Sequence, residues 1–244
     1  MDLSTGDVVR EAAAALVAQG AEAVVLVGSE ARGDAHARSD IDLYAIGAGP
    51  AYRLEVRSER LVSVSWRTLD AIRASLAAPE EVCQAVPAWA GSVILHDPNG
   101  TAAVIQGEAR AFDWANIADA CDACVPESLC GFAEEALKLR AALDRSDEWT
   151  ALVQRDVLAL GLASLVAVHR RLLFGTENVL WAQVAEALGP RWRAAQSSAF
   201  AQHGESVASS CAAALGLFAL AAAEVDALLN ERQRAVIRLA LESA

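Results

Sequence analysis

The stretch LVGSEARGDAHARSDIDL, residues 26–43, decides the interpretation of this chain. An apolar run from Ala23 to Val27 leads into Gly28-Ser29, and a spacer follows up to Ser39. Asp40-Ile-Asp42 then opens a second run, in which apolar and polar residues alternate as they do in a half-buried strand. The sequence therefore predicts two strands joined by a glycine-serine turn and a loop, with two carboxylates where the second strand begins.

This arrangement suits a divalent cation and a nucleotide. Asp40 and Asp42 stand at positions i and i+2, so they project from one face of a strand and converge on one hard cation such as Mg²⁺. A cation held there can bridge triphosphate oxygens and lower the charge barrier to attack at the α-phosphorus. Gly28 lets the backbone approach the phosphates, Ser29 can donate a hydrogen bond to one of them, and Arg32 can neutralise their charge.

The motif as a whole is more specific than its parts. Asp-x-Asp alone is common, and a surface turn followed by a strand would explain it. The full combination is much rarer: an apolar residue with Gly-Ser, a spacer, and then Ser39-Asp-apolar-Asp between two strands. We therefore interpret residues 28–42 as a metal and nucleotide site and include Ser39 among the nucleotide-binding candidates.

The patterns along the chain predict an α+β protein. Strands are expected only in the first hundred residues, at 23–27, 41–46 and 93–95 and in a hairpin formed by 52–56 and 61–66. Helices are expected in the same region at 8–19 and from the N-cap Thr68 to about residue 77. From Thr101 onward the sequence is helical, with breaks expected near Pro126, Ser146-Asp147, Gly175-Thr176 and Gly189-Pro190. We predict a small mixed-sheet domain at residues 1–105, which carries this motif, followed by an all-helical bundle domain at 106–244.

Composition limits the partners. A formal charge of −12 over 244 residues argues against a general nucleic-acid binder, because a polyanion would be repelled. The apolar stretch from Cys211 to Leu229 contains Glu224 and Asp226 and is read as a buried helix, and no signal peptide is expected at the acidic N-terminus. The five cysteines are interpreted as reduced, apolar helix residues. We expect a cytoplasmic protein with no membrane or nucleic-acid partner.

The motif resembles that of the polymerase-β-like nucleotidyltransferases, and within that superfamily it is most similar to the kanamycin (aminoglycoside 4′-O-) nucleotidyltransferases. The likeness continues beyond the motif through residues 61–66 with the helix after them, then VILHDPNG at 93–100, EEALKLR at 134–140 and LGLASLVAVHRR at 160–171. It covers most of residues 20–195. Only the first motif is specific, and the remainder is diffuse similarity.

The resemblance implies roles for residues in both halves of the chain. Asp40 and Asp42 would hold Mg²⁺, Glu134 would be the general base that deprotonates the acceptor hydroxyl, and Lys138 would hold a nucleotide phosphate. The spacing of Glu134 and Lys138 also fits a solvated ion pair on one face of a helix. The resemblance further implies transfer of a nucleoside monophosphate from a triphosphate to a hydroxyl of a small molecule, by a homodimer.

One position departs from the family pattern. The family places a third carboxylate on a later strand, at a site that falls on Ser63. The metal would then be held by two aspartates with phosphate and water, or Glu55 would replace the missing ligand, or catalysis would be lost or weakened. A hairpin that turns at Ser58-Glu59 would set Leu54 opposite Ser63 and point Glu55 to the other face.

Three functions follow from these observations. The first is an enzyme that modifies a small molecule; the acidic composition suits a cationic acceptor such as an aminoglycoside. The second is an antitoxin-like partner protein, against which the chain is longer than a minimal module. The third is a catalytically weakened nucleotide- or ligand-binding relative, motivated by Ser63.

Overall fold

The computed structural model describes residues 4–242, and the chain divides into two compact units. The first extends to Trp114 and the second begins at Ala115. The predicted boundary of 105/106 falls inside a helix, Thr101–Arg110, whose Ala102 and Ile105 side chains belong to a core cluster of the first unit.

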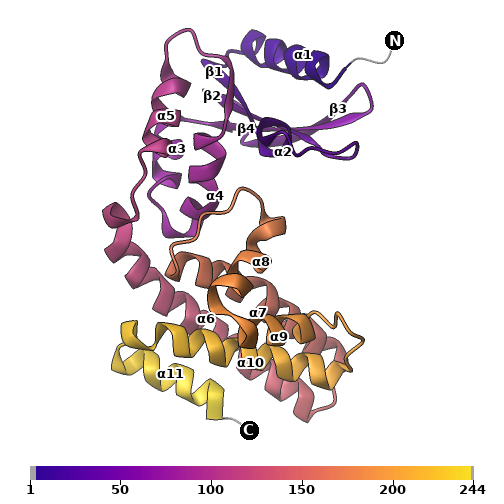
Figure 1. Ribbon diagram of the computed structural model, residues 1–244, viewed down its shortest axis with the longest axis vertical. Helices are drawn as coiled ribbons and strands as arrows, with labels where there is room; N and C mark the ends of the chain where they lie inside the picture. Colours follow the sequence, from indigo (N-terminus) through magenta and orange to yellow (C-terminus); the bar gives the residue numbers. More distant parts are fainter. Residues whose placement is uncertain (1–3, 243–244) are drawn as a thin grey trace. The chain divides into compact units, whose positions relative to one another are not determined.

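The N-terminal unit is a five-stranded sheet covered by helices (Figure 1). Its elements are α1 (Thr5–Ala18), β1 (Ala23–Val27), α2 (Gly28–Arg32), β2 (Ile41–Ile46), β3 (Tyr52–Arg57), β4 (Arg60–Arg67), α3 (Leu69–Ser75), α4 (Pro79–Ala90), β5 (Val93–His96) and α5 (Thr101–Arg110). Every predicted strand is present, and Thr68 caps α3 by accepting a hydrogen bond from the backbone N–H of Ala71. The α+β class predicted from the sequence is confirmed.

The strand order is β3-β4-β2-β1-β5, and β2 runs parallel to β4 while the other neighbours are antiparallel. Alternation along the strands separates two cores. On one face, Leu26, Leu43 and Val64 pack with the apolar side of α1. On the other face, Val25, Val27 and Ile46 pack with residues of α3, α4 and α5, among them the buried Trp89. Strand β1 is therefore buried on both faces.

Strand β3 reverses the usual pattern at the edge of the sheet. Its charged residues lie on the face that packs against α1, where Arg53 donates a hydrogen bond to Gln19 Oε1 at 2.8 Å. Its apolar residues Tyr52, Leu54 and Val56 lie on the other face and are more than half exposed.

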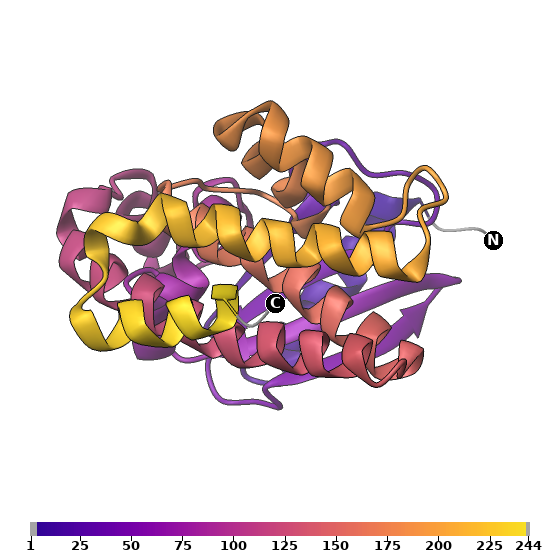
Figure 2. The same cartoon turned by 90° about the horizontal axis from the view of Figure 1, so that it is seen from below.

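The second unit is helical, as predicted. A 3-10 turn (Trp114–Ile117) crosses the boundary in the chain. The unit then contains α6 (Ala118–Asp144), α7 (Glu148–His169), α8 (Glu177–Leu188), α9 (Pro190–Ala199), α10 (Val207–Val225), a second 3-10 turn (Asp226–Leu228) and α11 (Glu231–Glu242). Figure 2 shows α10 beside α7 and α11 beside α6, both pairs in contact.

The predicted break near Pro126 is wrong, because α6 continues through it. A proline at this position forfeits one backbone hydrogen bond, to the carbonyl of residue 122. The apolar stripe of the helix nevertheless runs across it without interruption, with Val125, Leu129 and Ala133 all buried in the contact with neighbouring helices. Packing on both sides of the proline outweighs the lost bond. The other three predicted breaks separate helices in the structure.

Two helical segments are long and apolar enough to cross a membrane by length and composition, Glu148–His169 and Val207–Leu228. Both bury apolar side chains against other helices of the unit, including Leu162 of α7 and Phe218 of α10. Core helices of soluble proteins pass the same test, so this is weak support for a membrane span.

Candidate active site

The sheet register brings the motif together. Val27, the last residue of β1, lies opposite Asp42 of β2, and Asp42 lies level with Ser63 of β4. Gly28 follows directly and has φ +71°, which favours glycine. A Cβ atom on Gly28 would overlap Asp42 Oδ2 and stand only 3.1 Å from Asp42 Cγ. The glycine is therefore required both by its backbone conformation and by the carboxylate against it.

Asp42 is a half-buried carboxylate whose pKa is subject to opposing influences. Burial raises the pKa of Asp42 above its ordinary value, and the negative charge of Asp40 raises it further. The Ser63 hydroxyl donates a hydrogen bond to Asp42 Oδ1 at 2.5 Å, which lowers the pKa, as does the positive charge of Arg32. The charges of Asp40 and Arg32 therefore both act on the Asp42 carboxylate.

The donor set fits a hard divalent cation with few protein ligands. Two carboxylates at i and i+2 supply the oxygen ligands that Mg²⁺ prefers, and a cation would remove the repulsion between them. Within residues 4–242, no group of three or more histidine, cysteine, aspartate or glutamate side chains could hold a metal. Mg²⁺ retains several waters and is usually bound through one or two carboxylates plus substrate phosphate, so a pair of aspartates is compatible with such a site.

Ser63 occupies the position level with Asp42 where the resemblance implies a third carboxylate. The alternative ligand Glu55 lies opposite Val62, a core residue on the α1 side of the sheet, whereas Leu54 lies opposite Ser63. Glu55 instead accepts a hydrogen bond from Arg57 Nε at 2.7 Å. The register thus points Glu55 away from the face that carries Asp42.

The loop from residue 28 to residue 39 contains several internal hydrogen bonds. The Ser29 carbonyl accepts hydrogen bonds from the backbone N–H groups of Gly33 and Asp34, which closes the short helix α2. Arg32 pairs with Asp34 at 3.1 Å. The Ser39 hydroxyl accepts a hydrogen bond from the backbone N–H of His36 at 2.9 Å. Ser39 therefore shapes the turn that leads into Asp40.

Glu134 and Lys138 lie in the other compact unit, on α6. Lys138 Nζ is 2.9 Å from Glu134 Oε1 and 3.0 Å from Glu135 Oε1. Hydrogen bonds to Glu134 and Glu135 raise the pKa of Lys138. The Glu134 side chain is 70% exposed, so the pair has the properties of a solvated ion pair on a helix surface. The structure brings these two residues together, as their spacing predicted.

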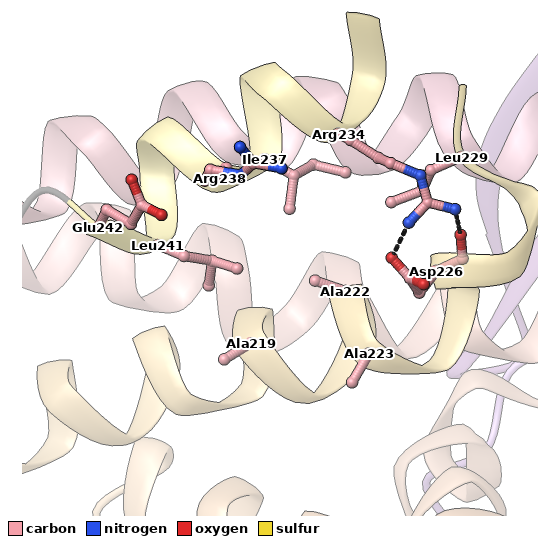
Figure 3. A pocket seen from close by; sticks show the side chains of 10 residues that line it. All are labelled: Ala219, Ala222, Ala223, Asp226, Leu229, Arg234, Ile237, Arg238, Leu241 and Glu242. Carbon is pink, nitrogen blue, oxygen red and sulfur yellow. Dashed lines mark hydrogen bonds and ion pairs between the residues drawn. The ribbon is translucent and has the colours of Figure 1, made fainter. Parts of the chain in front are cut away.

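Two cavities of the helical unit involve none of the predicted site residues. One, of about 310 Å³, lies between α10 and α11; alanines of α10 form its floor, and the ion pair of Asp226 with Arg234 closes one end (Figure 3). The other, of about 490 Å³, is lined by α9 and the segment after it, including Ser197 and His203. The chemistry predicted from the sequence does not reside in either cavity.

Sequence reasoning missed one residue that contacts the motif. Arg60, the first residue of β4, donates a hydrogen bond to the carbonyl of Ser39, immediately before Asp40. It also pairs with Glu30 of α2 at 2.7 Å. The only sequence signal for it was its place after the predicted hairpin turn, which does not reveal that β4 lies beside β2.

Two comparisons with known proteins found similarity to nucleotidyltransferases. The sequence profile of the family described as nucleotidyltransferase domain matches residues 9–84. A nucleotidyltransferase-like protein from Exiguobacterium sibiricum 255-15 has a similar structure, with a TM-score of 0.54 over 95% of this chain and 80% of that one. The two sequences are 15% identical, so the likeness shows the fold alone. No curated protein sequence matches the chain.

Gly28, Asp40, Asp42 and Ser63 all fall within the matched residues. The match supports nucleotidyl transfer as the general class of activity, and it does not extend to the helical unit. Residues 9–84 thus resemble a nucleotidyltransferase domain, and the chain shares its fold with a nucleotidyltransferase-like protein.

Proposed function

We propose that the protein is a Mg²⁺-dependent nucleotidyltransferase that moves a nucleoside monophosphate from a nucleoside triphosphate to a hydroxyl of a small molecule. The observation that carries this proposal is the pairing of Asp40 and Asp42 at the start of β2, with the backbone of Gly28 against the second carboxylate. A side chain at residue 28 would collide with the Asp42 carboxylate. The profile match over the same residues supports the class of reaction.

Each polar group of the motif has a task in this reaction. Asp40 and Asp42 would hold Mg²⁺, which when bound supplies positive charge to the triphosphate and to the leaving pyrophosphate. Arg32, whose charge already acts on Asp42, adds a cation beside the phosphates. Gly28 and Ser29 present backbone and hydroxyl groups to the nucleotide, and Ser39 belongs to the same loop.

The roles proposed for Glu134 and Lys138 rest on the resemblance to kanamycin nucleotidyltransferases. Glu134 would take the proton from the acceptor hydroxyl, and Lys138 would contact a nucleotide phosphate as a point charge. Their mutual ion pair on α6 supports the presence of both charges on one helix face.

The acceptor is proposed to be a small cationic molecule of the aminoglycoside class. A chain with a formal charge of −12 attracts cations at long range and repels nucleic acid. This charge supports a cationic acceptor without selecting a particular one.

A homodimer is part of the same proposal. Helix α7 exposes a row of apolar side chains at helical spacing, Trp149, Val153, Val157 and Leu160, and Trp149 is 78% exposed. A second subunit would remove such a row from water. Sedimentation equilibrium at micromolar concentration tests this; a strict monomer would count against the close relationship to the aminoglycoside enzymes.

The test of function is a transfer assay. The protein is incubated with labelled ATP or GTP, Mg²⁺ and a panel of aminoglycosides, and the products are examined for a nucleotidylated acceptor. We expect the natural protein to transfer label to an acceptor. Asp42→Ala should lower the transfer rate on the order of 10³-fold, because it removes a metal ligand worth several kcal/mol. Labelled product that persists in Asp42→Ala would rule out this carboxylate as a ligand.

A second candidate is nucleotide binding without efficient transfer, favoured by a serine where the resemblance implies a third carboxylate. Ser63→Glu distinguishes the two. A large rise in rate would show that the missing carboxylate limits catalysis in the natural protein. An unchanged rate together with measurable transfer would show that two aspartates suffice.

A further inference from the structure

Arg60 connects three separate segments of the N-terminal unit. Its Nη1 donates a hydrogen bond to Thr5 Oγ1 in α1 at 2.8 Å. Its Nη2 donates to Glu30 Oε1 in α2 at 2.7 Å and to the carbonyl oxygen of Ser39 at 2.8 Å. The first of these segments is a covering helix, and the other two are the ends of the loop that separates Gly28-Ser29 from Asp40.

The register of the sheet explains how Arg60 reaches this loop. Because Ile41 pairs with Val62 in the parallel ladder, Arg60 lies level with Ser39. It shares its face of the sheet with Val62, which packs in the core beneath α1. Asp42 and Ser63 lie on the opposite face. Arg60 therefore supports the loop from behind the carboxylates and does not line the face that would receive substrate.

The contacts of Arg60 are sheltered. The side chains of Arg60 and Glu30 are only 19% and 18% exposed, compared with 46% and 39% for the pair Arg73–Glu108 in the same unit. Sheltered charges are screened less by salt and solvent than exposed ones. One nitrogen atom, Nη2, bonds both ends of the loop, so its loss would release Glu30 and Ser39 together.

We propose that Arg60 is a positioning residue, which fixes the loop of residues 30–39 so that Asp40 and Asp42 present a preformed cation site. This inference rests on the proposed function, in which those two carboxylates bind a divalent cation. It differs from a purely stabilising ion pair, because a stabilising pair would change the free energy of unfolding without changing the affinity of the folded protein for a metal.

The experiment compares the natural protein with Arg60→Gln, Arg60→Lys and the control Arg73→Gln, which removes the exposed ion pair to Glu108. Two quantities are measured on folded protein: hydrogen exchange of the backbone N–H groups of Gly33, Asp34 and Ser39, which are hydrogen-bonded within the loop, and Mn²⁺ affinity by titration. Mn²⁺ serves as the probe because it accepts the same oxygen ligands as Mg²⁺.

We expect Arg60→Gln to speed exchange in the loop and to weaken Mn²⁺ binding roughly 10-fold to 100-fold, as losses of groups that orient metal ligands do. Arg60→Lys should recover part of both, because lysine keeps the charge but lacks the fork that reaches two partners with fixed geometry. Arg73→Gln should change neither. If Arg60→Gln does not fold, the lysine variant carries the same comparison.

Unchanged exchange in the loop, or natural Mn²⁺ affinity in both Arg60 variants, would overturn the inference. Failure of the proposed function gives a different result. In that case the natural protein itself would bind no Mn²⁺, or would bind it equally well as Asp42→Ala, while faster loop exchange in Arg60→Gln would still show that Arg60 holds the loop.

Discussion

Two pairs of charged residues are predicted as parts of one site, Asp40 with Asp42 and Glu134 with Lys138. Their surroundings in the structure differ. Asp42 is half-buried, level with Ser63, and pressed against the backbone of Gly28. Glu134 projects from a helix surface with 70% of its side chain exposed and has Lys138 as its ion-pair partner. The first group is fixed by the sheet, the turn and the register together. The second requires only helical spacing.

The difference shows which sequence signals constrain chemistry. A strand-turn-strand motif places its residues through backbone pairing, so the backbone conformation or the register restricts which residue type fits each position. An i,i+4 pair of opposite charges forms on any exposed helix and has little structural consequence. Site assignments in the N-terminal unit therefore stand on geometry, whereas those on α6 stand on resemblance.

The largest effect on activity is expected from a substitution in the Glu134–Lys138 pair on α6. A large loss of activity there would show that an exposed helix pair can be as important for catalysis as the sheet motif. If Glu134 is the general base, Glu134→Gln should lower kcat by about 10²-fold to 10⁴-fold with folding unchanged, since the side chain is exposed. Glu135→Gln is the matched control, because Glu135 lies one residue away and also pairs with Lys138. Equal kinetics for the two variants would reduce the pair to a surface ion pair.

Much of the N-terminal unit could be predicted because its signals are local. The strands β1 and β2 and the turn at Gly28 follow from alternation and turn chemistry within residues 23–46. Helix α4 was not predicted: Ala78 offers no side-chain cap at its start, and Pro87 lies inside it. The helix forms because buried residues, including Trp89, pack beneath the sheet.

Non-local pairing accounts for what the sequence could not show. The hydrogen bond from Ser63 to Asp42 and the contacts of Arg60 both depend on β4 lying parallel to β2, a pairing that joins residues 21 apart in the chain. The hairpin register that turns Glu55 away from this face could be predicted, because it depends only on the position of the turn at Ser58-Glu59.

The next effect concerns Gly28. Gly28→Ala forces a methyl group against the Asp42 carboxylate, and displacing a reacting group by about 1 Å costs roughly 10²-fold in rate. Gly100→Ala is the matched control: Gly100 has φ +73° and open space around the added Cβ. Both variants should lose about 1–2 kcal/mol of unfolding free energy from backbone strain. Transfer activity should fall only in Gly28→Ala; comparable activity in the two variants would refute the close approach.

A smaller effect is expected at Ser63. Ser63→Ala removes the hydrogen bond that orients Asp42, and we expect about tenfold weaker Mn²⁺ binding by titration. Ser65→Ala is the control on the same strand and face, level with Tyr44. Should both variants bind Mn²⁺ as the natural protein does, the hydroxyl of Ser63 would have no part in positioning the carboxylate.

The smallest effect calibrates what an exposed ion pair contributes by itself. The hydrogen bonds of Arg73 hold the pKa of Glu108 below its ordinary value of 4.5. A carboxylate with a lowered folded-state pKa stabilises the protein above its unfolded-state value and loses that contribution as pH falls through the folded-state value. Arg73→Gln should therefore lower the urea midpoint slightly at pH 7, and the difference should vanish as the pH drops below 4.5. A difference that persists in acid would mean that Arg73 stabilises the protein through packing of its side chain. The contribution of Lys138 on α6 would then also have to be measured as packing and not only as an ion pair.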